Sequence, residues 1–377
     1  TSQGATASNV KLLCCNQSTV TGSTVTPVTI DTVGTPTVIT QTAVGAHPPT
    51  ATPTASKSDV ENPSVNNTAG YWSGGSAGGG NPSMRSTTDK LTFATDTTAR
   101  IPGSNRPTVV HFATGTSSTT KGYAHGGYTG WENPRTDSIY SFTYASGSWA
   151  NIPSALSETA GKVGAVNNTI AAYSVGGGGS DPASYHSKVD KLVFATETSS
   201  KNITQSSRDL QWATSVGSPS AGYYCNPKYD SQSGSTSVEK LTYSTETVAL
   251  STTLFMSGNQ DGSNARIMAT QGFGKHDVGY VCGSYPPQRT TVNKITYSTD
   301  TRSSTPTLPS AEYDGAGLTS PSTGYFSSPH TNSNQTFKMP YSTETWTTSP
   351  SNMELSDSRF QATGFSAGMN GNLFPSQ

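Results

Sequence analysis

The hydrophobic pattern of this chain is dominated by aromatic residues that return at a nearly constant interval. In five places an aromatic closes a short strand and is followed by a small residue, Thr, an acidic residue and Thr, as in Phe-Ala-Thr-Asp-Thr at 93–97. A sixth, divergent copy occupies 144–149. The aromatics stand 51, 50, 49, 54 and 44 residues apart, at Phe93, Tyr144, Phe194, Tyr243, Tyr297 and Tyr341. An internal period of about 50 residues indicates an array of similar structural units.

Two further markers repeat with the same period. A Tyr, preceded by Gly in every copy but one, recurs at Tyr71, Tyr123, Tyr173, Tyr223, Tyr280 and Tyr325. An Ala lies upstream of it, at Ala113, Ala165, Ala213, Ala269, Ala316 and Ala362. Because Tyr71 has no such Ala before it and Ala362 has no Tyr after it, the first and last units are two parts of one unit.

Each unit therefore contains four predicted strands: one around the Ala, one at Gly-Tyr, one ending at the aromatic, and one after the Thr-acid-Thr turn. Four antiparallel strands joined by short turns form the blade of a β-propeller. The sequence thus predicts an all-β, six-bladed propeller over residues 69–377. Residues 359–364 should form a strand beside residues 70–101, which closes the ring and protects the sheet edges.

Composition supports strands and narrows the function. Charged residues make up 12% of the chain, about half of the usual share, while Thr, Ser, Gly and Asn are over-used. The net charge of −1 and the lack of a long Lys/Arg cluster give no field that would attract nucleic acid. No apolar stretch approaches the length of a bilayer crossing, so we expect no membrane insertion. Four cysteines are too few for a disulfide framework.

An N-terminal arm precedes the repeats. Residues 1–45 carry no copy of the repeat but contain short β-prone runs, which usually add strands to another molecule. Residues 46–68 form a Pro/Thr-rich linker. The apolar start is expected to anchor the arm in a partner through Leu12, Leu13, Cys14 and Cys15. The adjacent cysteines could also bind a metal or oxidise, but no His or further Cys accompanies them at ligand spacing.

The acidic residue of each turn admits two interpretations. Near-equivalent carboxylates could surround the axis and hold a metal, or they could stabilise the turns by bonding to nearby backbone amides. We favour the second interpretation, because Asp, Asn and Thr commonly act in turns in this way.

No catalytic pattern stands out among the other reactive residues. The six histidines, at His47, His111, His125, His186, His276 and His330, lack the spacing of a metal site. Cys225 and Cys282 occupy the same place in two neighbouring units, which indicates packing rather than copper chemistry. We therefore expect no catalytic residue, no metal and no cofactor.

Two loops between the second and third strands of a unit are candidates for contact with a glycan or a host surface. One contains Tyr128, Trp131, Asn133 and Arg135, and the corresponding loop of another unit contains Tyr285, Gln288 and Arg289. Aromatic, amide and guanidinium groups suit stacking on sugar rings and bonding to hydroxyls. The same groups also serve in ordinary loop packing.

The second unit resembles the kelch signature of a Gly pair, a Tyr and a Trp, with Gly126-Gly127, Tyr140 or Tyr144, and Trp149. The chain as a whole looks like the kelch-like repeat proteins of marine tailed phages, especially those that infect cyanobacteria. Gly-Tyr-Phe at 324–326 and Tyr-Ser-Thr-Glu-Thr at 341–345 carry this resemblance. The start of the arm, residues 10–16, resembles a segment of marine phage appendage proteins.

This resemblance implies a virion protein on the particle surface. It would be a tail or capsid fibre or appendage whose propeller head attaches to the host, or a decoration of the particle. The implied partners are other virion proteins through the arm, further copies of the chain, and a host surface glycan or envelope protein. The alternative is a propeller enzyme, either a glycan hydrolase or a galactose-oxidase-like oxidase.

Overall fold

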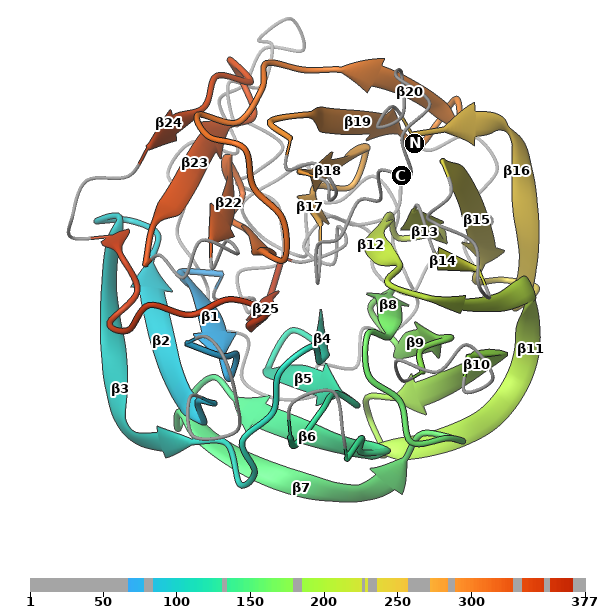
Figure 1. The fold of residues 1–377 in the computed structure, drawn as a ribbon, viewed down its shortest axis with the longest axis horizontal. Coiled ribbons are helices and arrows are strands. Elements are labelled where there is room, and N and C mark those ends of the chain that lie inside the picture. The colour runs from blue at the N-terminus through green and yellow to red at the C-terminus, as the bar shows by residue number, and fades with distance from the viewer. Residues whose placement is uncertain are drawn as a thin grey trace, which may run out of the picture. The chain divides into compact units, whose positions relative to one another are not determined.

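The computed structural model describes residues 67–77, 84–130, 134–178, 185–225, 228–229, 236–256, 272–283, 289–327, 334–348 and 353–368. These residues lie in one compact unit of the chain, 61–377. Six antiparallel sheets surround a central axis, and the described residues contain no α-helix (Figure 1). The prediction of an all-β, six-bladed propeller is confirmed. The predicted arm and all of the predicted linker except Asn67 and Thr68 fall outside the described residues.

The first strand of each blade lies nearest the axis (Figure 1). Blade 1 consists of β25 (Thr363–Ser366), β1 (Ala69–Ser73), β2 (Thr87–Thr92) and β3 (Thr97–Asn105). Blade 2 consists of β4 (Thr114–Ser117), β5 (Lys121–His125), β6 (Ser138–Thr143) and β7 (Ser148–Ala155). Blade 3 consists of β8 (Gly164–Asn167), β9 (Ala171–Val175), β10 (His186–Val193) and β11 (Thr198–Gln211), with β14 (Lys228–Tyr229) beside β11.

The remaining three blades follow the same order. Blade 4 consists of β12 (Thr214–Gly217), β13 (Ala221–Cys225), β15 (Ser237–Thr242) and β16 (Thr247–Phe255). Blade 5 consists of β17 (Phe273–Gly274), β18 (Val278–Cys282), β19 (Val292–Thr296) and β20 (Thr301–Ser304). Blade 6 consists of β21 (Ala316–Thr319), β22 (Thr323–Ser327), β23 (Thr336–Pro340) and β24 (Thr347–Thr348).

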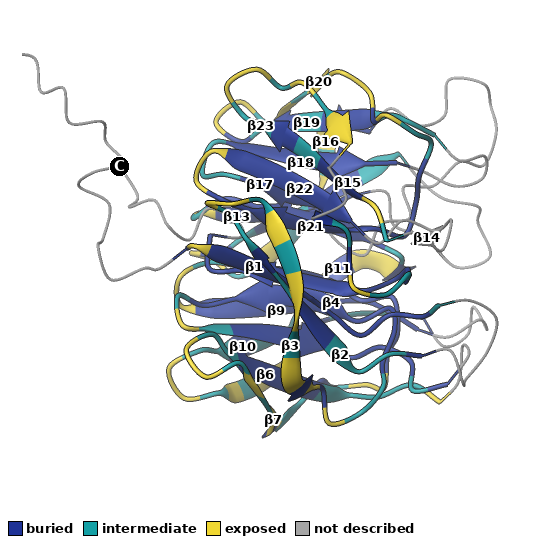
Figure 2. Ribbon diagram, turned by 90° about the vertical axis from the view of Figure 1, so that its left-hand side faces the viewer, coloured by how far each residue is buried: buried dark blue, intermediate teal, exposed yellow. Residues whose placement is uncertain are grey.

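Burial decreases from the axis to the rim. Every residue of the inner strands β4 and β8 is buried, because these strands pack between neighbouring blades on both faces. The outermost strand β3 is mostly exposed, as Figure 2 shows along its length. Thr and Ser suit this outer position, since a β-branched or small polar side chain is compatible with a solvated strand. The hydroxyl-rich composition therefore reflects a large perimeter of outer strands.

The C-terminal strand closes the ring, as the sequence predicts. Strand β25 pairs antiparallel with β1, and Phe365 lies opposite Tyr71. The strand begins at Thr363 rather than at the predicted residue 359, because Gln361 has a φ of +58°, which interrupts an extended strand. Phe360 instead forms an isolated bridge with Ser76.

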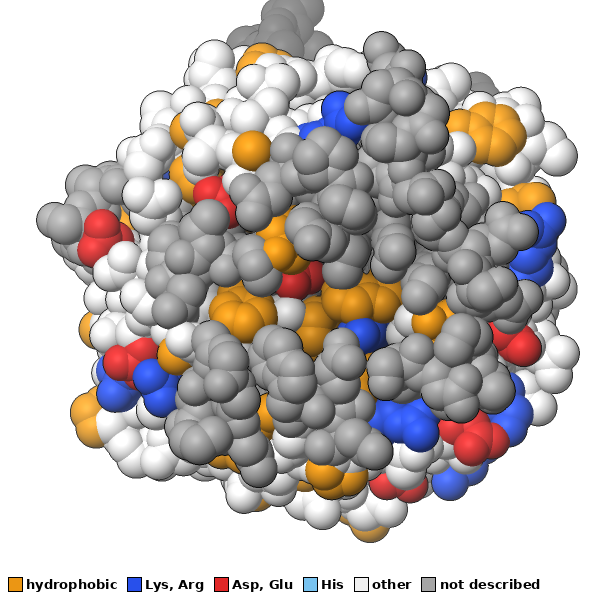
Figure 3. Space-filling view, in the orientation of Figure 1, with side chains coloured by type: hydrophobic (Ala, Val, Ile, Leu, Met, Phe, Trp, Pro, Cys, Tyr) orange, Lys and Arg blue, Asp and Glu red, His pale blue; other side chains and the backbone are white. Residues whose placement is uncertain are grey.

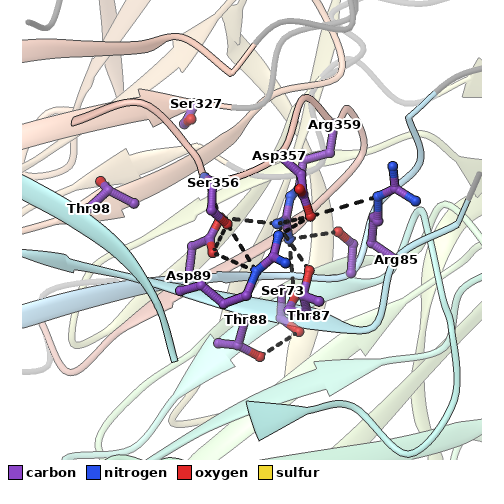
Figure 4. A network of polar contacts seen from close by, with 12 residues as sticks. Ser73, Arg85, Thr87, Thr88, Asp89, Thr98, Ser327, Ser356, Asp357 and Arg359 are labelled. Atoms are coloured by element: carbon purple, nitrogen blue, oxygen red, sulfur yellow. Dashed lines mark hydrogen bonds and ion pairs between the residues drawn. The ribbon is translucent and has the colours of Figure 1, made fainter. Parts of the chain in front are cut away.

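A buried ion pair reinforces this closure. The guanidinium of Arg359 donates to the carboxylate of Asp89 on β2 at 3.0 Å, and both side chains are fully buried. The backbone N–H of Ser356 donates to the same carboxylate at 3.0 Å. Figure 4 shows these side chains pointing toward one another, with Thr87 also bound by Arg359. The segment that leads into the last strand is thus attached to blade 1 by side chains as well as by the sheet.

The two aromatic markers of the sequence meet across every seam between blades. The Tyr of each second strand stacks on the aromatic that follows the third strand of the next blade, with ring centroids 5.0–5.8 Å apart. The stacked pairs are Tyr71–Tyr144, Tyr123–Phe194, Tyr173–Tyr243, Tyr223–Tyr297, Tyr280–Tyr341 and Tyr325–Phe93. The repeat period in the sequence therefore records packing between blades.

The alanine marker is only partly in register. Ala113, Ala213 and Ala362 each lie three residues before the residue that pairs with the second-strand Tyr. Ala165 lies one residue before that position and Ala316 two residues before it. Several positions of an inner strand require a small residue where blades approach closely, so an Ala there does not fix the register.

Candidate functional site

The repeated acids occupy a strained position at the outer turn of each blade. Their φ angles are +50° to +53°, in the left-handed region, at Asp96, Glu197, Glu246, Asp300 and Glu344. In blade 2 the corresponding residue is Gly147, with a φ of +65°. Glycine is the residue that adopts this conformation at least cost, so the retention of an acid in five blades requires compensating contacts.

Those contacts come from the preceding blade. The hydroxyl of Tyr223 and the ammonium of Lys240 both donate to Asp300, each at 2.6 Å. Equivalent Tyr-acid-Lys contacts are Tyr173 and Lys191 with Glu246, Tyr280 and Lys294 with Glu344, and Tyr325 and Lys338 with Asp96. In blade 2, Ser141 lies opposite Tyr123, and Glu197 is bound by Tyr123 and by Lys121 of the second strand instead. The acids therefore bind side chains across the seams, and among the described residues these contacts take the place of the expected bonds to nearby backbone amides.

The electrostatics of the triads follow from this geometry. Desolvation opposes ionisation of Glu344, but hydrogen bonds from Lys294 and Tyr280 outweigh it and lower the pKa of that carboxyl. Burial and the charge of Glu246 raise the pKa of Tyr173 to about 12. These contacts therefore favour an ionised Glu344 and a neutral Tyr173 phenol near neutral pH.

The seam between blades 1 and 2 has no acid and is built differently. Tyr71, Phe142, Phe365 and Trp149 form a mutually packed aromatic cluster there. The guanidinium of Arg106 lies 5.0 Å from the centroid of the Trp149 ring. Burial lowers the pKa of Arg106 to about 10. This seam is therefore held by stacking and a cation–π contact.

At the axis, the chain enters the inner strands through left-handed residues. Their φ angles are +53° to +62°, at Phe112, Lys162, Trp212, Asp314 and Gln361. In four of them the N–H donates to the C=O of the counterpart in the preceding blade, at 3.1 Å from Lys162 to Phe112 and 3.0 Å from Trp212 to Lys162. The bonds from Phe112 to Gln361 and from Gln361 to Asp314 continue this chain of peptide contacts around the axis.

Four of these residues, Phe112, Lys162, Trp212 and Asp314, line a small axial pocket. The Lys162 ammonium lies 4.0 Å from the Trp212 ring centroid and 5.2 Å from that of Phe112. The pocket has a volume of about 10 Å³, which holds about one water molecule. Figure 3 shows hydrophobic side chains with basic and acidic groups at the centre of this face. Among the described residues, packed aromatic and charged groups thus leave this axial pocket with room for little more than one water molecule.

A second, larger cavity lies where blades 2 and 3 meet. Its volume is about 430 Å³, within the range of small-ligand pockets. We call it the polar groove and define it by Arg135, Glu158, His186, Lys188, Gln205 and Asp209. Arg135 is one of the residues predicted to contact a glycan. The other five were not predicted.

The shape of blade 3 produces this groove. Strand β11 has 14 residues. Lys188 pairs with Gln205 and His186 pairs with Leu210, so β11 advances by five residues where β10 advances by two. This irregularity is additional to a second register shift between Val189 and Lys191. A bulge bends its strand and redirects side chains. Here it places Gln205 and Asp209 at the groove.

The other predicted contact residues are distributed differently. Tyr128 is fully buried, donates to the Gly178 carbonyl at 2.7 Å, and packs beside Lys162. Arg289 forms an isolated bridge with Glu312 in blade 5 and does not line the groove. The remaining predicted residues, of the loops and of the arm, lie outside the described residues: Trp131, Asn133, Tyr285, Gln288, Leu12, Leu13, Cys14 and Cys15.

The buried His and Cys side chains serve packing and hydrogen bonding. His125 bonds Thr116 at 2.7 Å and Ser174 of the next blade at 3.1 Å, and burial lowers its pKa to about 3. Cys225 and Cys282 are buried in hydrophobic clusters, which confirms their predicted packing role. Burial raises the pKa of the Cys225 thiol.

Within the described ranges, no three His, Cys, Asp or Glu side chains are grouped closely enough to hold a metal ion. The same part of the chain contains no helix of the length and hydrophobicity that a membrane crossing needs. Comparison with protein-family models gives no match, and a search of curated proteins finds no relative.

Proposed function

We propose that this protein is a structural component of a phage particle, a tail or capsid appendage whose propeller head attaches to the host surface or decorates the particle. The head acts by binding and not by catalysis. The arm of residues 1–45 attaches it to other virion proteins, and several copies act together on one particle.

One observation carries this proposal: the repeated charged groups bind one another within the ring, whereas Arg135, Gln205 and Asp209 line a surface groove without hydrogen-bond partners among the described residues. At five seams an acid binds a Lys and a Tyr, and in the closing blade Arg359 binds Asp89. A rigid scaffold that presents a polar recess is suited to recognition, because a rigid surface loses little conformational entropy on binding. Arrayed copies would turn weak single contacts into tight attachment.

The proposal is tested by locating the protein in the particles of the phage that encodes it. An antibody against the propeller should decorate intact particles in electron micrographs. A chain lacking residues 1–45 should fold and yet be absent from particles, since the arm supplies the attachment. Unlabelled particles that lack the protein in mass spectrometry would refute the virion assignment, and normal incorporation of the truncated chain would refute the anchoring role.

A propeller hydrolase or oxidase is the competing function. Purified protein should contain no stoichiometric copper and should release no sugar from host envelope glycans. Bound copper or released sugar would show that the propeller is an enzyme and not a binding head.

A further inference from the structure

The polar groove combines committed and uncommitted side chains. Lys188 of β10 forms an ion pair with Glu158 of the link between blades 2 and 3, so these two charges are satisfied within the protein. The side chains of Arg135, Gln205 and Asp209 form no hydrogen bond or ion pair with any residue that the structure describes. These three groups are therefore available to a ligand.

His186 also lines the groove but differs from these three groups. Both of its ring nitrogens are buried, and neither has a hydrogen-bond partner among the described residues. Because a ligand in the groove cannot reach buried atoms, His186 shapes the groove without offering a hydrogen bond to a ligand.

The uncommitted charges balance. Arg135 contributes one positive charge and Asp209 one negative charge, while the Gln205 amide contributes a neutral donor and acceptor. A groove of this kind does not select a net charge. It selects a molecule whose groups both donate and accept hydrogen bonds, and hydroxyl groups do both.

We propose that the polar groove binds a short segment of an uncharged, hydroxyl-rich polysaccharide, with Arg135, Gln205 and Asp209 as its hydrogen-bonding partners. Arg135 and the Gln205 amide donate to sugar oxygens, and Asp209 accepts from sugar hydroxyls. This inference rests on the proposed attachment function, because it names the ligand class of that head.

Other ligands fit the groove less well. A zwitterionic peptide end would use Arg135 and Asp209 but leave Gln205 unmatched. An acidic glycan or a phosphate would place a negative charge beside Asp209 and Glu158. The volume of about 430 Å³ accommodates a segment of small-ligand size, rather than the single water of the axial pocket.

The experiment uses the full chain on a printed array of neutral and acidic bacterial polysaccharides, with an immobilised Gly-Gly peptide beside them. We expect retention on at least one neutral polysaccharide. Arg135→Ala and Asp209→Ala should each weaken it by at least about tenfold, since each removes a charged hydrogen-bonding partner. Lys201→Ala is the matched control, because it removes an exposed charge from β11 outside the groove and should change nothing. Soluble monosaccharides should compete only weakly if the ligand is a polymer segment.

The result that overturns the proposal is retention by no neutral polysaccharide, retention only by acidic glycans or by the peptide, or retention that neither groove variant alters. Thermal unfolding of each variant shows whether it is folded, and two separate substitutions guard against one failing to fold. Particle labelling by the antibody is independent of this array, so a groove that binds no glycan leaves the virion assignment in place.

Discussion

At the scale of single residues, each seam between blades depends on a stacked aromatic pair and, in five cases, on a carboxylate held by Tyr and Lys. The stacking contributes buried area that is the same in kind at all seams. The carboxylate contributes a charge-assisted contact that blade 2 lacks, because Gly147 replaces the acid. The molecule thus contains its own comparison between a seam with the acid and a seam without it.

Tyr223→Phe removes the hydroxyl that donates to Asp300. We expect the free energy of unfolding to fall by about 1 kcal/mol, the size of a hydrogen bond to a charged group that is partly exposed. Tyr71→Phe is the control, since the turn facing Tyr71 carries Gly147, and its loss should be within about 0.5 kcal/mol. Denaturant titration of both variants measures the difference. Equal losses would mean that the hydroxyl–carboxylate contact adds nothing.

Gly147→Asp should complete the sixth triad. Lys90 lies opposite Tyr71 in the sheet, as Lys240 lies opposite Tyr223, and Gly147 already has the φ of the acids. A Cβ there would approach Ile101 at an ordinary 3.4 Å. We expect the free energy of unfolding of Gly147→Asp to exceed that of Gly147→Asn by about 0.5–1 kcal/mol, because Asn shares the turn preference but lacks the charge. Melting temperatures at low and high salt measure this gain, and an equal stability of the two variants at low salt would contradict it.

The buried His125 should make the ring sensitive to acid. Its folded-state pKa of about 3 is depressed by burial below the unfolded value of about 6.5. The contribution of the neutral His125 to the free energy of unfolding is therefore complete above about pH 6.5 and is lost progressively as the pH falls toward 3. His125→Val copies Val175, the residue at the equivalent place in blade 3. Between pH 6 and 4 the free energy of unfolding of the variant should fall by about 1.4 kcal/mol less per pH unit than that of the unchanged protein. Parallel pH profiles of unfolding for the two proteins would contradict this account.

At the scale of elements, the ring is closed by a strand of four residues and by the buried pair Arg359–Asp89. Four residues of sheet pairing are modest, so the ion pair carries much of the attachment of the C-terminal segment. Both charges are fully buried, and a buried charge that loses its partner is strongly destabilising.

Arg359→Met should therefore cost about 3–5 kcal/mol, because it leaves the Asp89 carboxylate buried without its counter-ion. The double variant Arg359→Met with Asp89→Asn should recover part of this loss. Arg100→Met is the control, since Arg100 lies 4.0 Å from Asp89 but is 40% exposed, and it should cost less than about 1 kcal/mol. A similar cost for both single variants, measured by equilibrium unfolding, would contradict the closure role.

The strands could be predicted from the sequence because the two aromatic markers of the repeat pack against each other between neighbouring blades. Tyr223 and Tyr297, for example, stack on each other, so packing holds both at a fixed place in the repeat. The Ala marker failed at Ala165 and Ala316 because close packing at the axis demands a small residue without fixing which position carries it. The start of the last strand was misplaced because a left-handed Gln361 leaves no signal in residue type.

At the scale of the whole molecule, the propeller is a closed ring whose blades are bonded at the axis, at the seams and across the C-terminal closure. The candidate site was only partly predictable from the sequence. Arg135 belongs to a loop that stands out by composition, whereas Gln205 and Asp209 reach the groove through a bulge of β11 that does not alter the repeat period. Pairing irregularities of this kind arise from tertiary structure, so no local sequence pattern predicts them.

The most direct test of the central claim is to incubate the purified full-length chain with host envelope and to measure both the retained protein and the released sugar. A binding head should be retained, more strongly when clustered on a bead than as single molecules, with no sugar released over many hours. Lys201→Ala should be retained equally, and Arg135→Ala less. Sugar release that grows with time and with protein concentration, or no retention even of clustered protein, would contradict the proposal that the ring is a non-catalytic attachment head.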